Sequence, residues 1–154
     1  MKILVPVDGS ASAERALDYA IFLAKACGAS LGLIHVVQLP SSWTAPPWRV
    51  PAPASYDTVQ DQQETYREAI EIIESNGESI LTTAEAKTKT AGLPVEKIMQ
   101  SGHPADVIVR IAGEKGYDLI VMGSRGISGI KEMLLGSVSH HVSQHAKCSV
   151  LIAR

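Results

Sequence analysis

Ile3-Leu4-Val5-Pro6-Val7-Asp8-Gly9-Ser10 opens the chain with a short apolar run that ends in a turn sequence. A continuous apolar run with β-branched residues is typical of a strand buried on both faces. Beyond the turn, Ser10 or Ser12 can cap a helix, and Gly28 provides its C-terminal stop. We therefore predict a buried strand over residues 3–7 followed by a helix, which is the first unit of an α/β sheet.

The same alternation continues to the end of the chain. Further strands are predicted at 31–37, 95–99, 119–122 and 149–153, and further helices from Asp57 to Gly92, from Pro104 to Gly116, and from the cap residue Ser137 to about His145. Strands that alternate with helices predict a parallel sheet with helices on both faces, and right-handed crossovers make the fold doubly wound. The 154 residues fit a single domain, 1–154, interrupted by a proline-rich loop at 39–56.

Composition narrows the classes of function. A net charge of −2 argues against a basic nucleic-acid binder, and an aromatic content of 5% argues against a stacking platform for single strands. No apolar run approaches the length of a membrane span, and the first residues do not resemble a secretory signal. Cys27 and Cys148 form no disulfide framework. We expect a cytoplasmic protein with reduced thiols and with neither a nucleic-acid nor a membrane partner.

A glycine-rich segment follows the strand at 119–122. It contains Gly123, Gly126 and Gly129 and then Gly136-Ser137-Val138-Ser139. Glycines let the backbone approach a phosphate, successive N–H groups bind anions, and a helix N-terminus favours negative charge. With Arg125 as a mobile cation, the segment suits a polyphosphate, although it is neither a Walker A loop nor a Gly-x-Gly-x-x-Gly loop. An alternative also stays open, in which these glycines only occupy turns of a long loop and bind no ligand.

The spacing Gly123-x-x-Gly126, nine residues, Gly136-Ser137 resembles the nucleotide-binding signature of the universal stress protein family. The segments 3–10, 35–37, 102–104, 118–123 and 148–153 are also similar to that family. The resemblance spans nearly the whole chain apart from the proline-rich loop. It implies an ATP-binding member with a five-stranded parallel sheet of order 3-2-1-4-5.

The resemblance also assigns roles to residues. Pro6, Val7 and Asp8 would flank the adenosine with Asp8 near the ribose, the Val36 backbone would recognise the adenine edge, and Met122 would pack against the base. The phosphates of ATP, ADP or AMP would lie among Gly123, Ser124, Arg125, Gly126 and Gly129 on one side and Gly136, Ser137, Val138 and Ser139 on the other. Phosphates and water would supply most of the ligands of a Mg²⁺ or Mn²⁺ ion. Asp8 would be the one candidate protein ligand, and there would be no dedicated metal site.

Three functions compete on these residues. The first is a nucleotide-dependent regulator or protection factor in the stress response. The second is an ATP-cleaving hydrolase or adenylyl-transferring enzyme on the same fold. Asp8 is the one acid that the sequence puts at the site, and it also suits an Asx turn, so we assign no catalytic residue and expect at most slow hydrolysis. The third is an interaction module without nucleotide that uses the proline-rich loop, and the intact glycines argue against it.

Two further features lie near the C-terminus. His141 and His145 are four residues apart on a predicted helix, which suggests a zinc site, but no third ligand is evident and a solvated helix face is favoured. The last strand, 149–153, is an edge strand in the implied order and carries Val150, Leu151 and Ile152. Such edges tend to be covered, so we predict a homodimer through residues 149–153.

Overall fold

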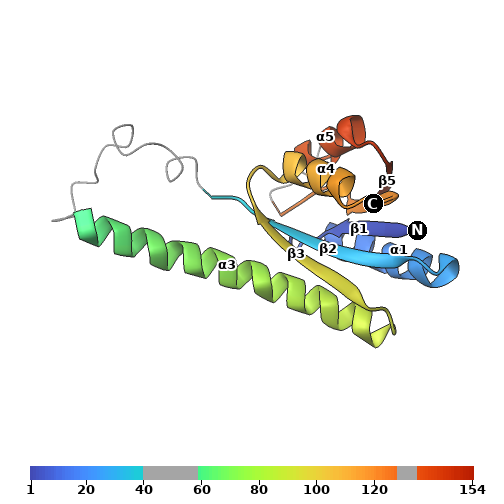
Figure 1. Cartoon of the computed structure of the whole chain (residues 1–154), viewed down its shortest axis with the longest axis horizontal. Helices are drawn as coiled ribbons and strands as arrows, with labels where there is room; N and C mark the ends of the chain where they lie inside the picture. The colour runs from blue at the N-terminus through green and yellow to red at the C-terminus, as the bar shows by residue number, and fades with distance from the viewer. Residues whose placement is uncertain (40–58, 128–134) are drawn as a thin grey trace.

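A computed structural model describes residues 1–39, 59–127 and 135–154. The predictions for most of the loop 39–56, for Asp57 as a helix cap and for Gly129 lie outside these residues. Five strands form one parallel sheet of order β3-β2-β1-β4-β5 (Figure 1), and they are β1 (Lys2–Pro6), β2 (Ser30–Val37), β3 (Val95–Ser101), β4 (Leu119–Gly123) and β5 (Ser149–Ala153). The fold class predicted from the sequence and the strand order that the resemblance implies are both confirmed.

The central strand β1 is buried on both faces, as its apolar run predicts. Alternate residues point to opposite faces, so Ile3 and Val5 join a core with α1 and α3, while Leu4 joins a core with α4 and α5. All three side chains are fully buried. Burying a side chain of this size stabilises the fold by about 1.5–3 kcal/mol. The two cores fix which helices flank each face of the sheet.

Helix α1 (Ala11–Cys27) follows the turn after β1. Its N-cap is Ser10, whose Oγ accepts a hydrogen bond from the Ala13 N–H at 3.1 Å, and Gly28 ends the helix in the left-handed region at φ 61°. Both caps agree with the sequence prediction, and Ser10 rather than Ser12 does the capping. Because Ser10 caps the helix two residues after Asp8, α1 starts directly beyond the carboxyl end of β1.

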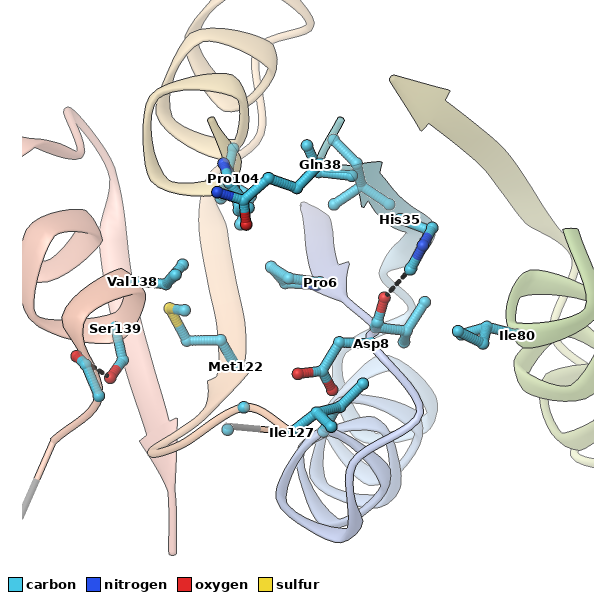
Figure 2. Close-up of a pocket in the computed structure, with 18 of the residues that line it drawn as sticks. Pro6, Asp8, His35, Gln38, Ile80, Pro104, Met122, Ile127, Val138 and Ser139 are labelled. Carbon is cyan, nitrogen blue, oxygen red and sulfur yellow. Dashed lines mark hydrogen bonds between the residues drawn. The ribbon is translucent and has the colours of Figure 1, made fainter. Parts of the chain in front are cut away.

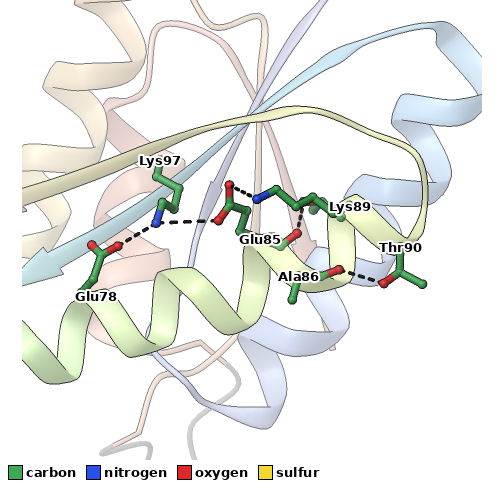
Figure 3. A network of polar contacts seen from close by, with 7 residues as sticks. Glu78, Glu85, Ala86, Lys89, Thr90 and Lys97 are labelled. Atoms are coloured by element: carbon green, nitrogen blue, oxygen red, sulfur yellow. Dashed lines mark hydrogen bonds and ion pairs between the residues drawn. The ribbon is translucent and has the colours of Figure 1, made fainter.

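Helix α3 (Val59–Thr90) packs against β2 and β3 on the α1 side of the sheet (Figure 1). Its Gly77, which reduces helix propensity, lies directly against His35 of β2: an added Cβ would lie 2.8 Å from His35 Cδ2. Farther along the helix, Lys97 of β3 reaches Glu78 at 2.6 Å and Glu85 at 3.7 Å (Figure 3). Close packing and these ion pairs hold α3 to the sheet.

Helices α4 (Pro104–Glu114) and α5 (Ser137–His145) cover the opposite face (Figure 1). The prediction that Ser137 caps α5 is wrong, because the N-cap is Gly136, at φ −72° and ψ 161°. The Gly136 N–H donates to the Ser124 carbonyl at 2.7 Å, which turns the chain into the helix one residue earlier. Among the described residues, no helix combines the length and the apolar character needed to cross a membrane.

Candidate functional site

A cavity of about 720 Å³ opens beyond the carboxyl ends of β1, β2 and β4 (Figure 2). This is the edge at which open α/β sheets bind ligands. Twelve of the residues singled out from the sequence line it, namely Pro6, Val7, Asp8, Val36, Met122, Gly123, Arg125, Gly126, Gly136, Ser137, Val138 and Ser139. The structure therefore gathers three separate sequence segments around a single space.

Asp8 points into the middle of this cavity (Figure 2). Its Oδ1 accepts a hydrogen bond from the Ser10 N–H at 2.9 Å, which is the Asx turn that the sequence suggested. Its Oδ2 faces Gly126, where an added Cβ would lie 2.7 Å away. Among the described residues that line the cavity, Asp8 is the only carboxylate. The turn therefore holds one charged group in a fixed position inside the site.

The glycines of the signature have different structural roles. A Cβ on Gly123 would lie 2.6 Å from Ser12 Oγ and 2.7 Å from the Ser12 carbonyl carbon, so β4 needs a glycine here to pass the start of α1. A Cβ on Gly136 would meet only ordinary contacts, the nearest at 3.5 Å, and its backbone conformation suits any residue. Packing thus explains Gly123 and does not explain Gly136.

The N-terminus of α5 lies at the cavity. Since its N-cap is a glycine, no side chain caps the amides of the first turn, which contains Ser137, Val138 and Ser139 and no acidic residue. These amides and the helix dipole favour a negatively charged group. The Ser139 hydroxyl, expected to face a phosphate, instead donates to the Ser124 carbonyl at 2.9 Å. What α5 offers a ligand is therefore the backbone of its first turn and the exposed side chain of Ser137.

Ser124 does not line the cavity, although the resemblance assigned it to the nucleotide. The residue is buried, at 4% exposure, and its carbonyl accepts hydrogen bonds from the Gly136 N–H and from Ser139 Oγ. Its own N–H donates to the Ala153 carbonyl at 2.8 Å. Ser124 therefore links the carboxyl ends of β4 and β5 to the start of α5. It supports the site without lining the cavity.

The α3 wall of the cavity is not predicted by the sequence motifs. This wall contains Ile73, Asn76, Gly77 and Ile80 together with His35 from β2. The helix predicted between Asp57 and Gly92 gave no sign that one of its faces borders a cavity. On the opposite wall, Pro104 and Ile108 of α4 complete the lining. The cavity therefore extends over both faces of the sheet end.

The universal stress protein family model matches residues 1–154. This chain belongs to the universal stress protein family. Within that family, it is 42% identical over 158 aligned residues to universal stress protein YxiE of Bacillus subtilis, covering 99% of this chain and 98% of that protein. The match covers nearly the full length of both proteins.

Two solved structures are similar to this universal stress protein. One is a universal stress protein in complex with cAMP, with a TM-score of 0.69, 29% identity, and coverage of 100% of this chain and 97% of that one. The other is the universal stress protein from Archaeoglobus fulgidus in complex with dAMP, with a TM-score of 0.66, 25% identity, and coverage of 100% and 98%. The fold of this chain is thus that of the solved family members.

Three histidines and an aspartate form a cluster on the surface between α4 and α5 of this universal stress protein. Asp106 contacts His103 Nδ1 at 3.3 Å and His141 Nε2 at 3.1 Å. The His141 ring stacks on that of His145, with centroids 4.1 Å apart. No group of three His, Cys, Asp or Glu side chains in the described part of the chain is arranged to hold a metal ion. The zinc hypothesis therefore gains no support, and the cluster links two helices.

Proposed function

We propose that this universal stress protein binds an adenine nucleotide, as ATP, ADP or AMP, together with Mg²⁺ or Mn²⁺ in the cavity beyond β1, β2 and β4. We further propose that it acts as a nucleotide-dependent regulator or protection factor in the stress response. The observation that carries the proposal is the start of α5 at the cavity, where Gly136 leaves the first-turn amides without a capping side chain. A phosphate is the ligand group that such a helix end favours.

The walls fit the remaining parts of such a ligand. In the proposal, the base packs against Met122 and is read by the Val36 backbone, and Asp8 accepts from the ribose hydroxyls. The phosphates lie between Gly126 and the start of α5, with Arg125 supplying positive charge. A divalent ion, when bound, neutralises phosphate charge and is held by phosphate and water oxygens, which suits a cavity whose described lining has Asp8 as its one carboxylate.

The relatives support the class of ligand. The two solved family members described above are complexes with cAMP and with dAMP. Both ligands contain an adenine, a sugar and one phosphate. Each of those three groups has a counterpart in the proposed site, in Met122, Asp8 and the start of α5 respectively.

Turnover is not expected to be fast. Rapid phosphoryl transfer needs a group that positions the attacking nucleophile as well as charge stabilisation around the phosphates. Asp8 already accepts from the Ser10 N–H, and no second carboxylate lines the described cavity. We therefore propose at most slow hydrolysis and a role in which the bound nucleotide itself is the signal.

Two further parts of the proposal concern the state of the protein. We propose a homodimer in which β5 is covered by β5 of a second copy, because β5 has a single strand neighbour and carries half-buried Val150, Leu151 and Ile152. Light scattering that finds only monomer at micromolar concentration would overturn this. We also propose a cytoplasmic location, a reducing compartment in which Cys27 and Cys148, both free thiols, remain reduced.

Calorimetric titration of the nucleotide-stripped protein with ATP and MgCl₂ tests the binding proposal. The variant Gly126→Asp puts a second carboxylate beside Asp8 and should abolish binding. The matched control is Gly113→Asp on α4, where an added Cβ has nothing within 4 Å and the cavity is not involved. The proposed site is supported if the wild type and the Gly113→Asp control bind ATP and the Gly126→Asp variant does not. Absence of binding by the wild type contradicts the proposed function.

A further inference from the structure

His35 contacts the backbone of the segment that carries Asp8. Its Nδ1 lies 2.8 Å from the carbonyl oxygen of Val7. Figure 2 draws this hydrogen bond as a dashed line from the labelled His35. β1 ends at Pro6, so this carbonyl lies beyond the last strand residue, and Val7 is buried, at 7% exposure. A buried carbonyl needs a hydrogen-bond donor. The His35 side chain supplies that donor.

This contact fixes the tautomer of His35. A carbonyl oxygen can only accept, so the ring must carry its proton on Nδ1. The direction of the ring is fixed from the other side by α3, where Gly77 has no side chain. An added Cβ there would lie 2.8 Å from His35 Cδ2 and 3.2 Å from both His35 Nε2 and Met99 Sδ. The missing side chain of Gly77 thus makes room for the ring.

The hydrogen bond acts directly on the geometry of Asp8. The Val7 carbonyl and the Asp8 N–H belong to one planar peptide group, so holding the oxygen fixes the plane from which the Asp8 side chain departs. The preceding peptide is also tied to β2, because the Val7 N–H donates to the Ile34 carbonyl at 2.9 Å. Consecutive peptides on the two sides of Val7 are therefore held by consecutive residues of β2.

We infer that His35 is a positioning residue for nucleotide binding: its Nδ1–H holds the Val7–Asp8 peptide so that the Asp8 carboxylate stays in the cavity between Ser10 and Gly126. The inference rests on the proposed function for its effect on affinity. It also makes a claim about the nucleotide-free protein. Loss of the donor should loosen the hydrogen bond from the Ser10 N–H to Asp8 Oδ1, which is 2.9 Å long.

Two variants whose side chains have the same number of heavy atoms and the same branching separate hydrogen bonding from packing. In His35→Asn the side-chain amide nitrogen occupies the position of Nδ1 and can still donate to Val7. In His35→Leu a side chain of the same branched shape carries no donor. A purely structural role for the ring predicts similar behaviour of the two variants. A positioning role predicts that asparagine rescues the function and leucine does not.

The first measurement is made without nucleotide. Two-bond ¹H–¹⁵N spectra of the wild type should show a protonated Nδ1 and an unprotonated Nε2 in neutral His35. Amide exchange of Ser10 should be faster in His35→Leu than in the wild type and unchanged in His35→Asn. A ring protonated on Nε2 in the wild type, or equal Ser10 exchange in all three proteins, overturns the inference whether or not the protein binds nucleotide.

The second measurement is the affinity for ATP with MgCl₂. His35→Leu should bind roughly tenfold more weakly than the wild type, the effect of one lost hydrogen bond, while His35→Asn should stay within about twofold. Equal affinities of wild type and His35→Leu contradict the inference and leave the proposed function standing. If the wild type binds no nucleotide, the proposed function fails, and the Ser10 exchange alone decides whether His35 positions Asp8.

Discussion

The Asp8 carboxylate lies directly against Gly126: a Cβ added to Gly126 would be 2.7 Å from Asp8 Oδ2. Real Cβ atoms do not approach an oxygen this closely, so any side chain at this position must displace the carboxylate. The backbone of Gly126 lies outside the left-handed region, which removes conformational strain as the reason for the glycine. The glycine that the signature places after β4 therefore protects the position of the acid that follows β1.

Gly126→Ala should weaken ATP binding roughly tenfold while leaving the free energy of unfolding within about 0.5 kcal/mol of the wild type, because the Asp8 carboxylate can shift within the cavity without moving the backbone. Calorimetry and chemical denaturation measure the two quantities. If the alanine acts by displacing Asp8, the double variant Asp8→Ala with Gly126→Ala should bind no more weakly than Asp8→Ala alone. Fully additive losses would show that Gly126 contacts the nucleotide independently of Asp8.

Substitutions at Gly136 should separate stability from binding. Gly136→Asp and Gly136→Asn both place a capping oxygen at the start of α5, where the backbone conformation and the space accept a side chain. Each should raise the free energy of unfolding by a few tenths of a kcal/mol. Each should also weaken ATP binding by occupying first-turn amides, and aspartate should weaken it more because its charge repels phosphate. Unchanged affinity in both variants would mean that the start of α5 does not bind the phosphates.

Much of this fold can be predicted from the sequence because its signals are local. Apolar runs such as 3–7 indicate strands buried on both faces, and Ser10 and Gly28 mark the ends of α1 by their own chemistry. The order of the strands came from the resemblance to a family. The start of α5 was misplaced by one residue, because the turn depends on a hydrogen bond from Gly136 to Ser124 that local sequence does not reveal.

The parts of the site that could not be predicted depend on contacts distant in sequence. From the sequence, Gly77 only lowers the helix propensity of its segment. The structure shows that it lies against His35, which is distant in the chain. Ser124 belongs to the glycine-rich signature, but its carbonyl accepts from Gly136 and Ser139 and it faces the protein interior. A motif identifies the segments that meet at a site, while packing decides which of their side chains line the cavity.

The ion pairs between α3 and β3 predict a pH-dependent contribution to stability (Figure 3). The hydrogen bond from Lys89 and the charge of Lys97 lower the pKa of Glu85 from 4.5, and the bond to Glu78 raises the pKa of Lys97 from 10.5. The stabilisation from these ion pairs is therefore complete between pH 4.5 and pH 10.5. It is lost as the pH falls below 4.5 through the lowered pKa of Glu85, or rises above 10.5 through the raised pKa of Lys97.

Lys97→Met should consequently lower the Tm most near neutral pH and have less effect toward both extremes. Calorimetric melting of the wild type and the variant over this range provides the test. The charged ends are solvent-exposed, so added salt should also shrink the difference. A Tm difference that is constant with pH would show that Lys97 contributes by packing its aliphatic stem instead.

Tyr117 should remain protonated well above the pH at which tyrosines ordinarily titrate. Burial, and next the nearby charge of Glu96, raise its pKa from 10.0 to about 12. Its hydroxyl lies above Gly32, where a Cβ would overlap it, and 3.3 Å from Glu96 Oε2. The folded state thus holds this proton more tightly than the unfolded state, so the stabilisation is complete below 10.0 and is lost as the pH rises toward about 12.

Two measurements check this behaviour against Tyr117→Phe. In an ultraviolet titration of tyrosinate absorbance, the wild type should show one late-titrating tyrosine that the variant lacks. The free energy of unfolding of the wild type should also fall more steeply than that of Tyr117→Phe between pH 10.0 and about 12. If the free energies of unfolding of the two proteins change with pH in parallel, the Tyr117 hydroxyl is open to water in solution. The ring would then not lie as close over Gly32 as the structure has it.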